Sequence, residues 1–299
     1  MVFETKGAIM PQTPYTMPPS TPKTPHTMPP STSKTVGTTP NNTTKTSAIA
    51  PQHAVPQTTN TAPNAKPLKP YQILSGAQLK YIAFISMLID HTNNALITPI
   101  LNGKGALLYI SNIFSVLGRI AFPIFMFFLI EGFFKTRNRK KYLASLLIFG
   151  LISEVPFDMF VSRTFFEPNW NNMMFTLSLC LGVIWLIDSL RAKLKNTLLW
   201  FITSLPILGI SCFIATWLSL DYDYHAVLVA YIFYIFRKKP VIGAGLGYIS
   251  IIKELWSILG FGLTLTYNGE RGRQYKWLNY AFYPVHLLIL GILRFYLNI

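Results

Sequence analysis

Residues 79–94, LKYIAFISMLIDHTNN, determine how the rest of the chain is interpreted. The apolar character continues to Thr98, which gives about 20 residues, the length needed to cross a bilayer core about 30 Å thick. Asp90 and His91 interrupt this run more than halfway along it. An acid and an imidazole at that depth are costly to insert and usually face a polar interior. The stretch therefore predicts a membrane-spanning helix that carries part of a functional site.

The composition of the whole chain is typical of a membrane protein. Of its 299 residues, 51% are hydrophobic and only 12% are charged. The net charge of +15 would suit a nucleic-acid partner, but much of the basic charge lies in short loops between apolar runs. Basic loops of this kind orient a protein in the membrane. We therefore expect the lipid bilayer, and no nucleic acid, as the partner.

The cysteine content predicts neither a disulfide framework nor a metal site. Cys180 and Cys212 are the two cysteines of the chain, and both lie within apolar segments. Cysteines in such surroundings are more often packing residues than a redox pair or a thioester nucleophile. Two cysteines do not make a structural zinc site, and we expect no metal.

The first 70 residues differ from the rest in composition. They are rich in Pro, Thr, Ser and Asn, and they contain an eleven-residue echo, YTMPPSTPKTP from Tyr15 and HTMPPSTSKTV from His26. With so few large apolar residues, this segment cannot offset the entropy lost on folding. It predicts a disordered tail over residues 1–70. No apolar stretch near Met1 resembles a cleaved signal peptide, so the first spanning helix is expected to direct insertion.

Residues 71–299 predict an all-α, polytopic helix bundle of about eight spans. After the first, the expected spans are residues 107–134, 142–161, 173–190, 197–220, 224–236, 241–266 and 277–297. Basic loops after the second, fourth and sixth spans then share one side, which the positive-inside rule makes cytoplasmic together with both termini. Two features resist this topology. The sixth segment is short enough to be re-entrant, and YNGERGRQYK after residue 266 would place Arg271, Arg273 and Lys276 outside.

Ionisable side chains from four expected spans share one depth. A rise of 1.5 Å per residue places His91, Glu154, Arg119 and His286 roughly 12 to 18 Å from the cytoplasmic side. A charged residue facing lipid at such a depth costs about 2.5 to 3.5 kcal/mol, so these groups must face one another or water. Two interpretations remain open. One is a structural network that locks helices together, and the other is a site for proton transfer.

The second interpretation assigns each group a chemical role. A neutral histidine is a general base, a carboxylate can hold its other nitrogen, and an arginine can stabilise an oxyanion. Asp90 precedes His91 directly and points about 100° away from it on a helix. Glu154 or Asp158, one turn apart on a common face, are therefore better candidates to orient His91.

Two further acidic positions have less specific patterns. Residues 221–225, DYDYH, would suit an outward mouth, although a solvated loop and helix start is the commoner origin of such a sequence. Glu131 falls beside the basic loop of residues 135–141. There it predicts an interfacial ion pair and not a catalyst.

Six strings in order resemble the TraX family of integral membrane proteins. They are LKYIAFISMLIDH at Leu79, GRIAFPIFMFFLIEGFFKTRNRKKYL at Gly118, ISEVPFD at Ile152, NMMFTLSL at Asn172, YNGERG at Tyr267 and YAFYPVHLLIL at Tyr280. The resemblance covers about residues 75–297. The family is associated with N-terminal acetylation of F-type pilin and is similar to the wider class of transmembrane acyltransferases. The resemblance therefore implies acyl transfer from acetyl-CoA in a bacterial plasma membrane.

The resemblance and the depth argument select overlapping residues. The expected catalytic set has His91 as general base, His286 as second base or donor-side ligand, Arg119 as anion stabiliser, and Asp90, Glu154 and Asp158 as accompanying acids. The expected donor-binding residues are Arg119, Arg137, Arg139 and Lys140, because the basic loop of residues 135–141 would meet the phosphates of acetyl-CoA. The acceptor would be an amine or a hydroxyl, on a pilin-like peptide or an envelope molecule.

Two functions from other classes remain open. A proton-coupled transporter or flippase would use the same midplane groups to relay protons or bind a solute. A non-catalytic assembly factor of a conjugation or secretion system would use the tail as a tether and would keep its function after these groups are neutralised.

Overall fold

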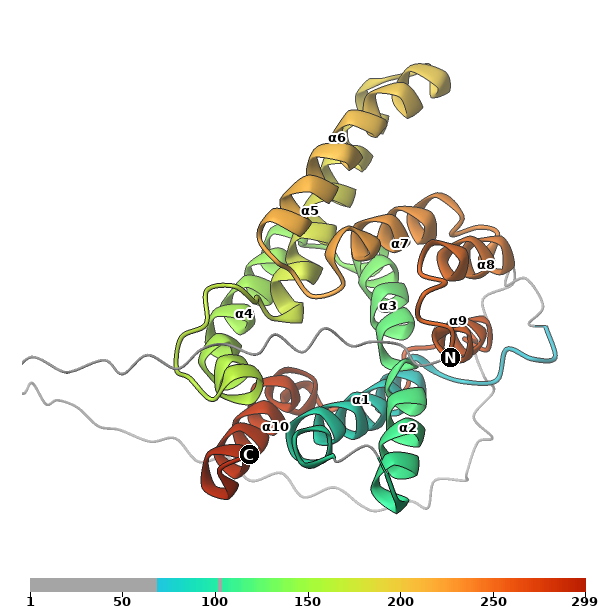
Figure 1. Cartoon of the computed structure of the whole chain (residues 1–299). Helices are drawn as coiled ribbons and strands as arrows, with labels where there is room; N and C mark the ends of the chain where they lie inside the picture. Colours follow the sequence, from blue (N-terminus) through green and yellow to red (C-terminus); the bar gives the residue numbers. More distant parts are fainter. Residues whose placement is uncertain (1–68, 102–103) are drawn as a thin grey trace, which may run out of the picture. The chain divides into compact units, whose positions relative to one another are not determined.

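The computed structural model describes residues 69–101 and 104–299, so the tail expected at residues 1–70 lies almost wholly outside the described residues. The described chain is all α-helical, which confirms the predicted fold class (Figure 1). Its α-helices are α1 Gly76–Thr92, α2 Ala106–Gly118, α3 Ala121–Lys135, α4 Arg139–Ser162, α5 Met173–Lys193, α6 Thr197–Trp217, α7 Asp223–Ile235, α8 Pro240–Ser250, α9 Ser257–Leu265 and α10 Lys276–Leu297.

The lengths of these helices suit a multi-pass membrane protein. Within the described residues, five helical stretches are long and apolar enough to cross a bilayer, namely Ala106–Lys135, Arg139–Ser162, Met173–Lys193, Thr197–Trp217 and Leu278–Leu297. The first of them comprises α2 and α3, which are separated by a break at Arg119 and Ile120. The 17-residue α1 continues through a π-helical turn, Asn93–Ile97, and a 3-10 turn, Thr98–Ile100, so helical backbone covers the predicted first span.

The start of α1 is fixed by a capping box. Oγ of Ser75 accepts a hydrogen bond from the backbone N–H of Gln78, and the side chain of Gln78 accepts one from the N–H of Ser75. Two otherwise unpaired donors of the first turn are satisfied in this way. Just before the cap, the N–H of Leu74 donates to the carbonyl of Thr266 at 2.9 Å. The chain entering α1 therefore lies against the segment that leaves α9.

The prediction of a single span over residues 241–266 was wrong. α8 and α9 are separated by a turn at residues 251–256. Their 11 and 9 residues give lengths of about 16 and 13 Å, which is roughly half the thickness of a bilayer core. They form a re-entrant helical hairpin, with Lys253 and Glu254 at its tip. A continuous lipid-facing helix would have buried these two charges at mid-depth.

This reversal inverts the topology of everything after it. Nζ of Lys135, at the end of α3, donates to Oη of Tyr267 at 2.6 Å and to the carbonyl of Gly269 at 3.2 Å. The segment of residues 267–275 therefore lies on the same face as the basic loop of residues 135–141, and we call this the basic face. Arg271 joins the other basic residues there, so the conflict with the positive-inside rule disappears.

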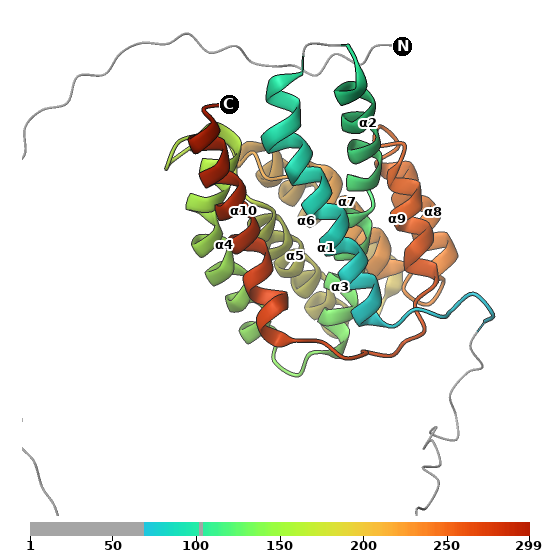
Figure 2. The same cartoon turned by 90° about the horizontal axis from the view of Figure 1, so that it is seen from below.

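The last helix consequently leaves the basic face instead of returning to it. α10 begins beside residues 267–275 and runs in the same direction as α1 (Figure 2). The expectation that α10 enters from the outside was therefore wrong. The C-terminus lies on the face opposite the start of α1 (Figure 2), while the expected side of the N-terminus falls on residues outside those described. His286 lies near the middle of α10, so its predicted depth survives the inversion.

α10 packs in parallel against α4. A Cβ atom on Gly291 would lie 2.8 Å from Cβ of Met159, so only glycine permits this close approach. At the far end, Nη1 of Arg294 donates to the carbonyls of Phe160 and Val161 at 2.5 and 2.6 Å. These are last-turn carbonyls of α4 that lack a helical partner. The pair of helices is thereby fixed at the face opposite the basic one.

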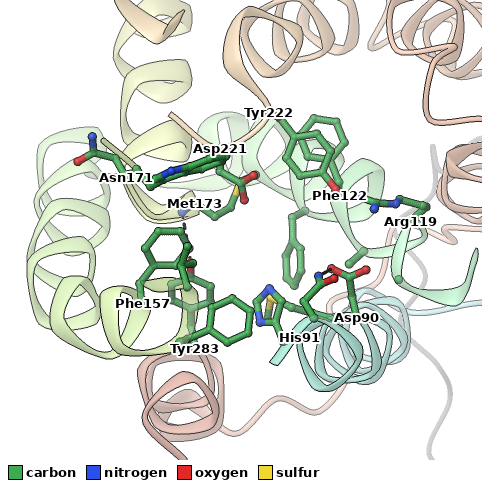
Figure 3. A pocket seen from close by; sticks show the side chains of 18 of the residues that line it. Asp90, His91, Arg119, Phe122, Phe157, Asn171, Met173, Asp221, Tyr222 and Tyr283 are labelled. Atoms are coloured by element: carbon green, nitrogen blue, oxygen red, sulfur yellow. Dashed lines mark hydrogen bonds between the residues drawn. The ribbon is translucent and has the colours of Figure 1, made fainter. Parts of the chain in front are cut away.

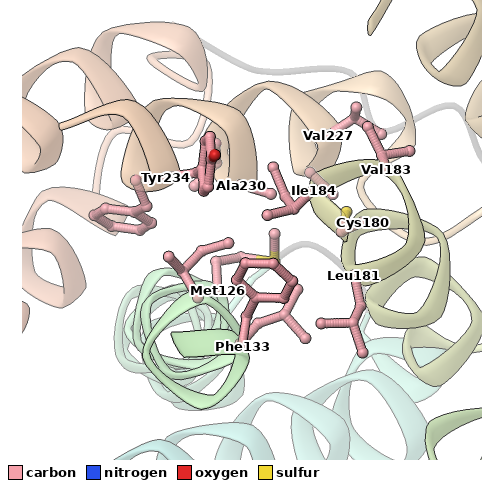
Figure 4. Packing of buried hydrophobic residues seen from close by; sticks show 14 of the residues in the cluster. Met126, Phe133, Cys180, Leu181, Val183, Ile184, Val227, Ala230 and Tyr234 are labelled. Atoms are coloured by element: carbon pink, nitrogen blue, oxygen red, sulfur yellow. The ribbon is translucent and has the colours of Figure 1, made fainter. Parts of the chain in front are cut away.

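The largest apolar core lies among α3, α5 and α7 (Figure 4). Its fully or nearly fully buried members include Met126, Phe133, Cys180, Leu181, Ile184, Val227 and Ala230. Cys180 is a packing residue there, as its apolar surroundings predicted. This core fixes α3 and α7 relative to each other, and both helices contribute residues to the cavity described below.

The end of α7 is tied to the end of α3 by charges. Glu131 pairs with Lys135 at 3.1 Å and with Arg237 at 3.0 Å. The predicted interfacial ion pair of Glu131 is confirmed by these contacts. Since Tyr222 at the start of α7 lines a cavity away from this face, the short α7 extends from that cavity to the basic face.

Candidate active site

A cavity of about 500 Å³ lies among helices that are far apart in the sequence (Figure 3). Its wall is built from α1, the break between α2 and α3, α4, the turn before α7, the tip of the α8–α9 hairpin and α10. We call it the histidine cavity, and its polar lining residues are Asp90, His91, Asn94, Arg119, Asn171, Asp221, Tyr222, Asp223, Lys253, Glu254, Tyr283 and Arg294.

His91 and His286 meet at this cavity. Nδ1 of His91 lies 2.7 Å from Nε2 of His286. The ring centroids are 5.0 Å apart and the ring planes differ by 6°. With the nitrogens so close and the centroids so far apart, the rings meet edge to edge, as a hydrogen bond requires. The prediction from depth that these two residues share a level is confirmed.

The positions of the ring hydrogens in this pair follow from a contact between His286 and the backbone of Phe282. Nδ1 of His286 lies 2.6 Å from the carbonyl oxygen of Phe282, which can only accept. His286 therefore carries its hydrogen on Nδ1, and in the neutral ring its Nε2 is an acceptor. Nδ1 of His91 must then be the donor, which leaves the lone pair of His91 on Nε2. The hydrogen bonds that run from His91 through His286 to Phe282 thus leave one imidazole nitrogen of His91 unprotonated.

Only one of the two histidines faces the histidine cavity. His91 is a lining residue, whereas His286 lines an apolar groove between α1 and α10. The ring of Phe160 lies against His91, with centroids 4.9 Å apart. Among the described residues, no group hydrogen-bonds to Nε2 of His91. The free nitrogen is therefore the one available to a molecule in the cavity.

Arg119 lies where a membrane-embedded helix is broken. The break at residues 119–120 frees carbonyls of α2, and Oγ of Ser86 donates to those of Leu117 and Gly118 at 2.6 and 3.1 Å. Irregular backbone at membrane depth is tolerated where neighbouring groups satisfy it and where it lines a cavity. Nε of Arg119 lies 3.1 Å from Oε2 of Glu254, so the hairpin tip holds the guanidinium at the cavity wall.

Asp90 lies beside the same break and does not contact His91. Its Oδ2 accepts a hydrogen bond from Nδ2 of Asn94 at 3.1 Å. A Cβ atom on Gly118 would lie 2.2 Å from Oδ1 of Asp90, so the carboxylate occupies the space that a side chain would need. The expectation that neighbouring residues on a helix diverge holds here, and Asp90 lines the cavity wall without orienting the His91 ring.

The turn before α7 completes the wall opposite His91 (Figure 3). Tyr222 stacks on Phe122 with ring centroids 3.8 Å apart. Ser219, Tyr222 and Asp223 all have positive φ values, a strained conformation for residues with side chains that is concentrated at functional sites. Burial, with the nearby Asp90 carboxylate as a smaller cause, raises the pKa of the Asp221 carboxyl to about 6. The DYDYH pattern therefore contributes three residues to the cavity wall and is not merely a solvated loop.

The structure does not bring Glu154 or Asp158 to His91. Glu154 accepts a hydrogen bond from Nδ2 of Asn172, the residue that also caps α5. Asp158 accepts one from the backbone N–H of Glu167 at 3.1 Å. These contacts join α4 to the chain that leads into α5, which is the structural alternative left open for such residues. His286 occupies the orienting position expected of a carboxylate.

Two further cavities connect this site with the basic face. The basic vestibule, about 640 Å³, is lined by Lys80, Glu131, Lys135, Arg137, Lys141, Tyr267, Arg271 and Gln274 among others. The middle cavity, about 300 Å³, is mostly apolar and shares Lys80, Phe128, Tyr142, Arg271, Gln274 and Tyr280 with the vestibule. It shares Met87, Phe125, Met173 and Tyr283 with the histidine cavity. The three cavities therefore adjoin one another from the basic face to His91.

The structure places the predicted donor-binding residues in separate parts of the molecule. Arg137 lines the basic vestibule and Arg119 lines the histidine cavity. Nη1 of Arg139 lies 2.8 Å from Oδ2 of Asp188, and its guanidinium lies over the ring of Phe133. Lys140 is exposed outside the vestibule. The structure thus places only one residue of the expected loop set, Arg137, in a position to meet a ligand of the vestibule.

Sequence reasoning missed several residues of the wall. Glu254 and Lys253 had an available signal, because two charges in the middle of an apolar run of residues 241–266 predict a break. No sequence signal pointed to Arg294, because its depth depends on the direction in which α10 crosses the bundle. Within the described residues, no group of three or more His, Cys, Asp or Glu side chains is placed to hold a metal ion.

Comparison with known proteins gives two matches. A family model described as "TraX protein" matches residues 75–294. The chain is also similar to "Probable fimbrial assembly protein FimC, serogroup H1" of Dichelobacter nodosus, with 30% identity over 258 residues. That match covers 75% of this chain and 97% of the relative. No solved structure matches the chain.

Proposed function

The chain belongs to the TraX family, and on that premise we propose that it is a membrane acyltransferase of pilus assembly that moves an acetyl group from acetyl-CoA to an amine or a hydroxyl. The observation that carries the proposal is the hydrogen-bonded pair of His91 and His286. It leaves an unprotonated imidazole nitrogen facing a cavity, and acyl transfer to a nucleophile needs a base in that position.

The reaction can be written on the residues of the histidine cavity. Nε2 of His91 removes the proton from the acceptor amine or hydroxyl as that group attacks the thioester carbonyl. The developing oxyanion needs a fixed positive charge, and Arg119, held by Glu254, is placed in the same wall to supply it. Collapse of the tetrahedral intermediate breaks the C–S bond, and the leaving thiolate takes the proton back from His91.

The arrangement of the cavities supports a donor that enters from the basic face. Positive charge at the vestibule suits the phosphates of coenzyme A. The apolar middle cavity suits the slim arm that carries the thioester, and its wall is continuous with that of the histidine cavity. The positive-inside rule makes the basic face cytoplasmic, where acetyl-CoA is available.

The role in pilus assembly comes from the family and from the relative named a probable fimbrial assembly protein. An acceptor on a pilin-like peptide or another envelope molecule would reach the histidine cavity from the face opposite the vestibule. The strained turn before α7 and the tip of the hairpin line that cavity and are the elements placed to contact the acceptor.

A transporter is the second candidate, because adjoining cavities also suit the passage of a solute. The assay that separates the candidates uses purified protein in lipid nanodiscs with acetyl-CoA labelled in the acetyl group. Acyl transfer predicts protein-dependent loss of the thioester, with label moving to water or to added amine. A transporter or a non-catalytic assembly factor predicts intact acetyl-CoA at the level of protein-free nanodiscs.

A further inference from the structure

Three cations near the basic face are paired with carboxylates. Lys135 and Arg237 share Glu131, and Arg139 pairs with Asp188. Within residues 69–101 and 104–299, no carboxylate pairs with Lys80 or with Arg271. These two side chains therefore remain available for an anion that comes from outside the chain.

Both residues stand at the junction of two cavities. Lys80 from α1 and Arg271 from the segment before α10 each line the basic vestibule and the middle cavity. Nζ of Lys80 lies 3.3 Å from Oε1 of Gln274 and 5.3 Å from the ring centroid of Phe128. Its charge is thus half-buried and has only neutral partners.

Two like charges at one junction oppose each other. Lys80 and Arg271 line the same two cavities, so their positive charges face a common space. Such repulsion is strengthened where water is partly excluded, and a bound anion with at least two negative charges would relieve it. An arginine fork and a lysine ammonium together are a common means of binding phosphate groups.

The distance from this junction to the base also restricts the ligand. His91 follows Lys80 by eleven positions on α1, which corresponds to a rise of about 16 Å along the helix. The walls in between are mainly apolar and include Phe84, Met87 and Leu177. A ligand that spans the interval must therefore join its anionic group to a long, narrow chain. The extended pantetheine arm has this length and shape.

We propose that Lys80 and Arg271 form a diphosphate-binding site at the entrance to the middle cavity, and that it holds the diphosphate of coenzyme A with the pantetheine arm directed toward His91. This inference rests on the proposed function and adds the site that positions the donor. A lipid-linked diphosphate shares the same chemistry, so the test includes it as a separate probe.

The experiment measures binding of coenzyme A by calorimetry to the full-length protein in phosphatidylcholine nanodiscs. Lys80→Gln and Arg271→Gln are each expected to raise Kd roughly tenfold or more, because each removes a charge-assisted contact. Arg273→Gln is a matched control on an exposed residue outside both cavities, and it should change Kd less than about twofold. Lys80→Arg keeps the charge and should retain most of the affinity, which separates lost binding from lost folding.

The outcomes distinguish this site from the proposed reaction. Unchanged coenzyme A affinity in Lys80→Gln and Arg271→Gln would overturn the site, even if acetyl transfer persists. Affinity that depends on both residues without any acetyl transfer would support the site and overturn the reaction. Farnesyl diphosphate that binds with the same dependence, where coenzyme A does not bind, would support a diphosphate site and overturn coenzyme A as its ligand.

Discussion

Nε of Arg119, at the break between α2 and α3, lies 3.1 Å from Oε2 of Glu254 at the tip of the α8–α9 hairpin. This ion pair joins two irregular segments at membrane depth, and both segments line the histidine cavity. The pair fixes the guanidinium in the cavity wall, where the proposed reaction needs a positive charge, so its two members are expected to act as one unit.

A double-mutant cycle tests this unit. Arg119→Gln and Glu254→Gln should each lower kcat for acetyl transfer about tenfold or more, since the first removes the charge and the second leaves it unheld. The double variant should be no slower than Arg119→Gln alone, because residues that act together are not additive. Glu270→Gln, an exposed carboxylate on the basic face, is the control. Strictly additive losses in the double variant would show that Glu254 does not act through Arg119.

The re-entrant hairpin predicts which faces are accessible. In a variant without native cysteines, Arg273→Cys and Lys140→Cys should react with an impermeant maleimide from the same side of the membrane, and Tyr296→Cys from the other. All three positions are exposed. Labelling of Arg273→Cys and Tyr296→Cys in the reverse pattern, with Arg273→Cys opposite Lys140→Cys, would restore a spanning segment at residues 241–266.

Gly118 predicts a stability effect at the site. A methyl group there would displace the carboxylate of Asp90, so Gly118→Ala should destabilise the protein by about 1–3 kcal/mol. Gly182 lies within α5 with no atom within 4 Å of an added Cβ, so Gly182→Ala should be neutral or stabilise by up to ~1 kcal/mol. Unfolding of both variants in mixed micelles measures the difference, and equal stabilities would contradict the close contact.

Asp221 predicts a pH-dependent stability. Burial raises the pKa of its carboxyl from 3.8 to about 6, so the folded protein holds the proton more tightly than the unfolded chain does. Its contribution to stability is therefore full below about pH 4, falls as the pH rises through 6, and is lost above that. Asp221→Asn should be more stable than the natural chain at pH 7 by roughly 1–3 kcal/mol, and the gain should shrink to about a third of that at pH 4.5. Unfolding midpoints between pH 4.5 and 8 test this, and parallel curves would refute it.

Much of the fold followed from apolar length and charge placement. The bundle, most helix positions and the shared depth of His91 and His286 were predictable, because each depends on residues close together in the sequence. The course of residues 241–266 was not predicted, although Lys253 and Glu254 gave a local signal. One reversed hairpin then changed the side on which α10 begins, an effect that hydropathy alone does not reveal.

The site was predictable at the level of residue type and less so at the level of partners. Depth along a helix selected Glu154, but depth says nothing about which way the side chain points around the helix axis. Glu154 lies on the side of α4 that faces Asn172. The hydrogen-bond partner of His91 is therefore His286 and not Glu154. Similarly, the basic loop was recognised by charge, but only the structure shows that Arg139 is already neutralised by Asp188.

The most direct measurement of the central claim is acetyl transfer from labelled acetyl-CoA by the natural chain, His91→Ala, His286→Gln and His286→Leu, compared in identical nanodiscs. Loss of the base should lower kcat by roughly 10² to 10⁴ in His91→Ala. His286→Gln, whose amide oxygen can still accept from Nδ1 of His91, should retain more activity than His286→Leu, which cannot accept. The account predicts this ranking, and full activity in a correctly inserted His91→Ala variant would contradict it.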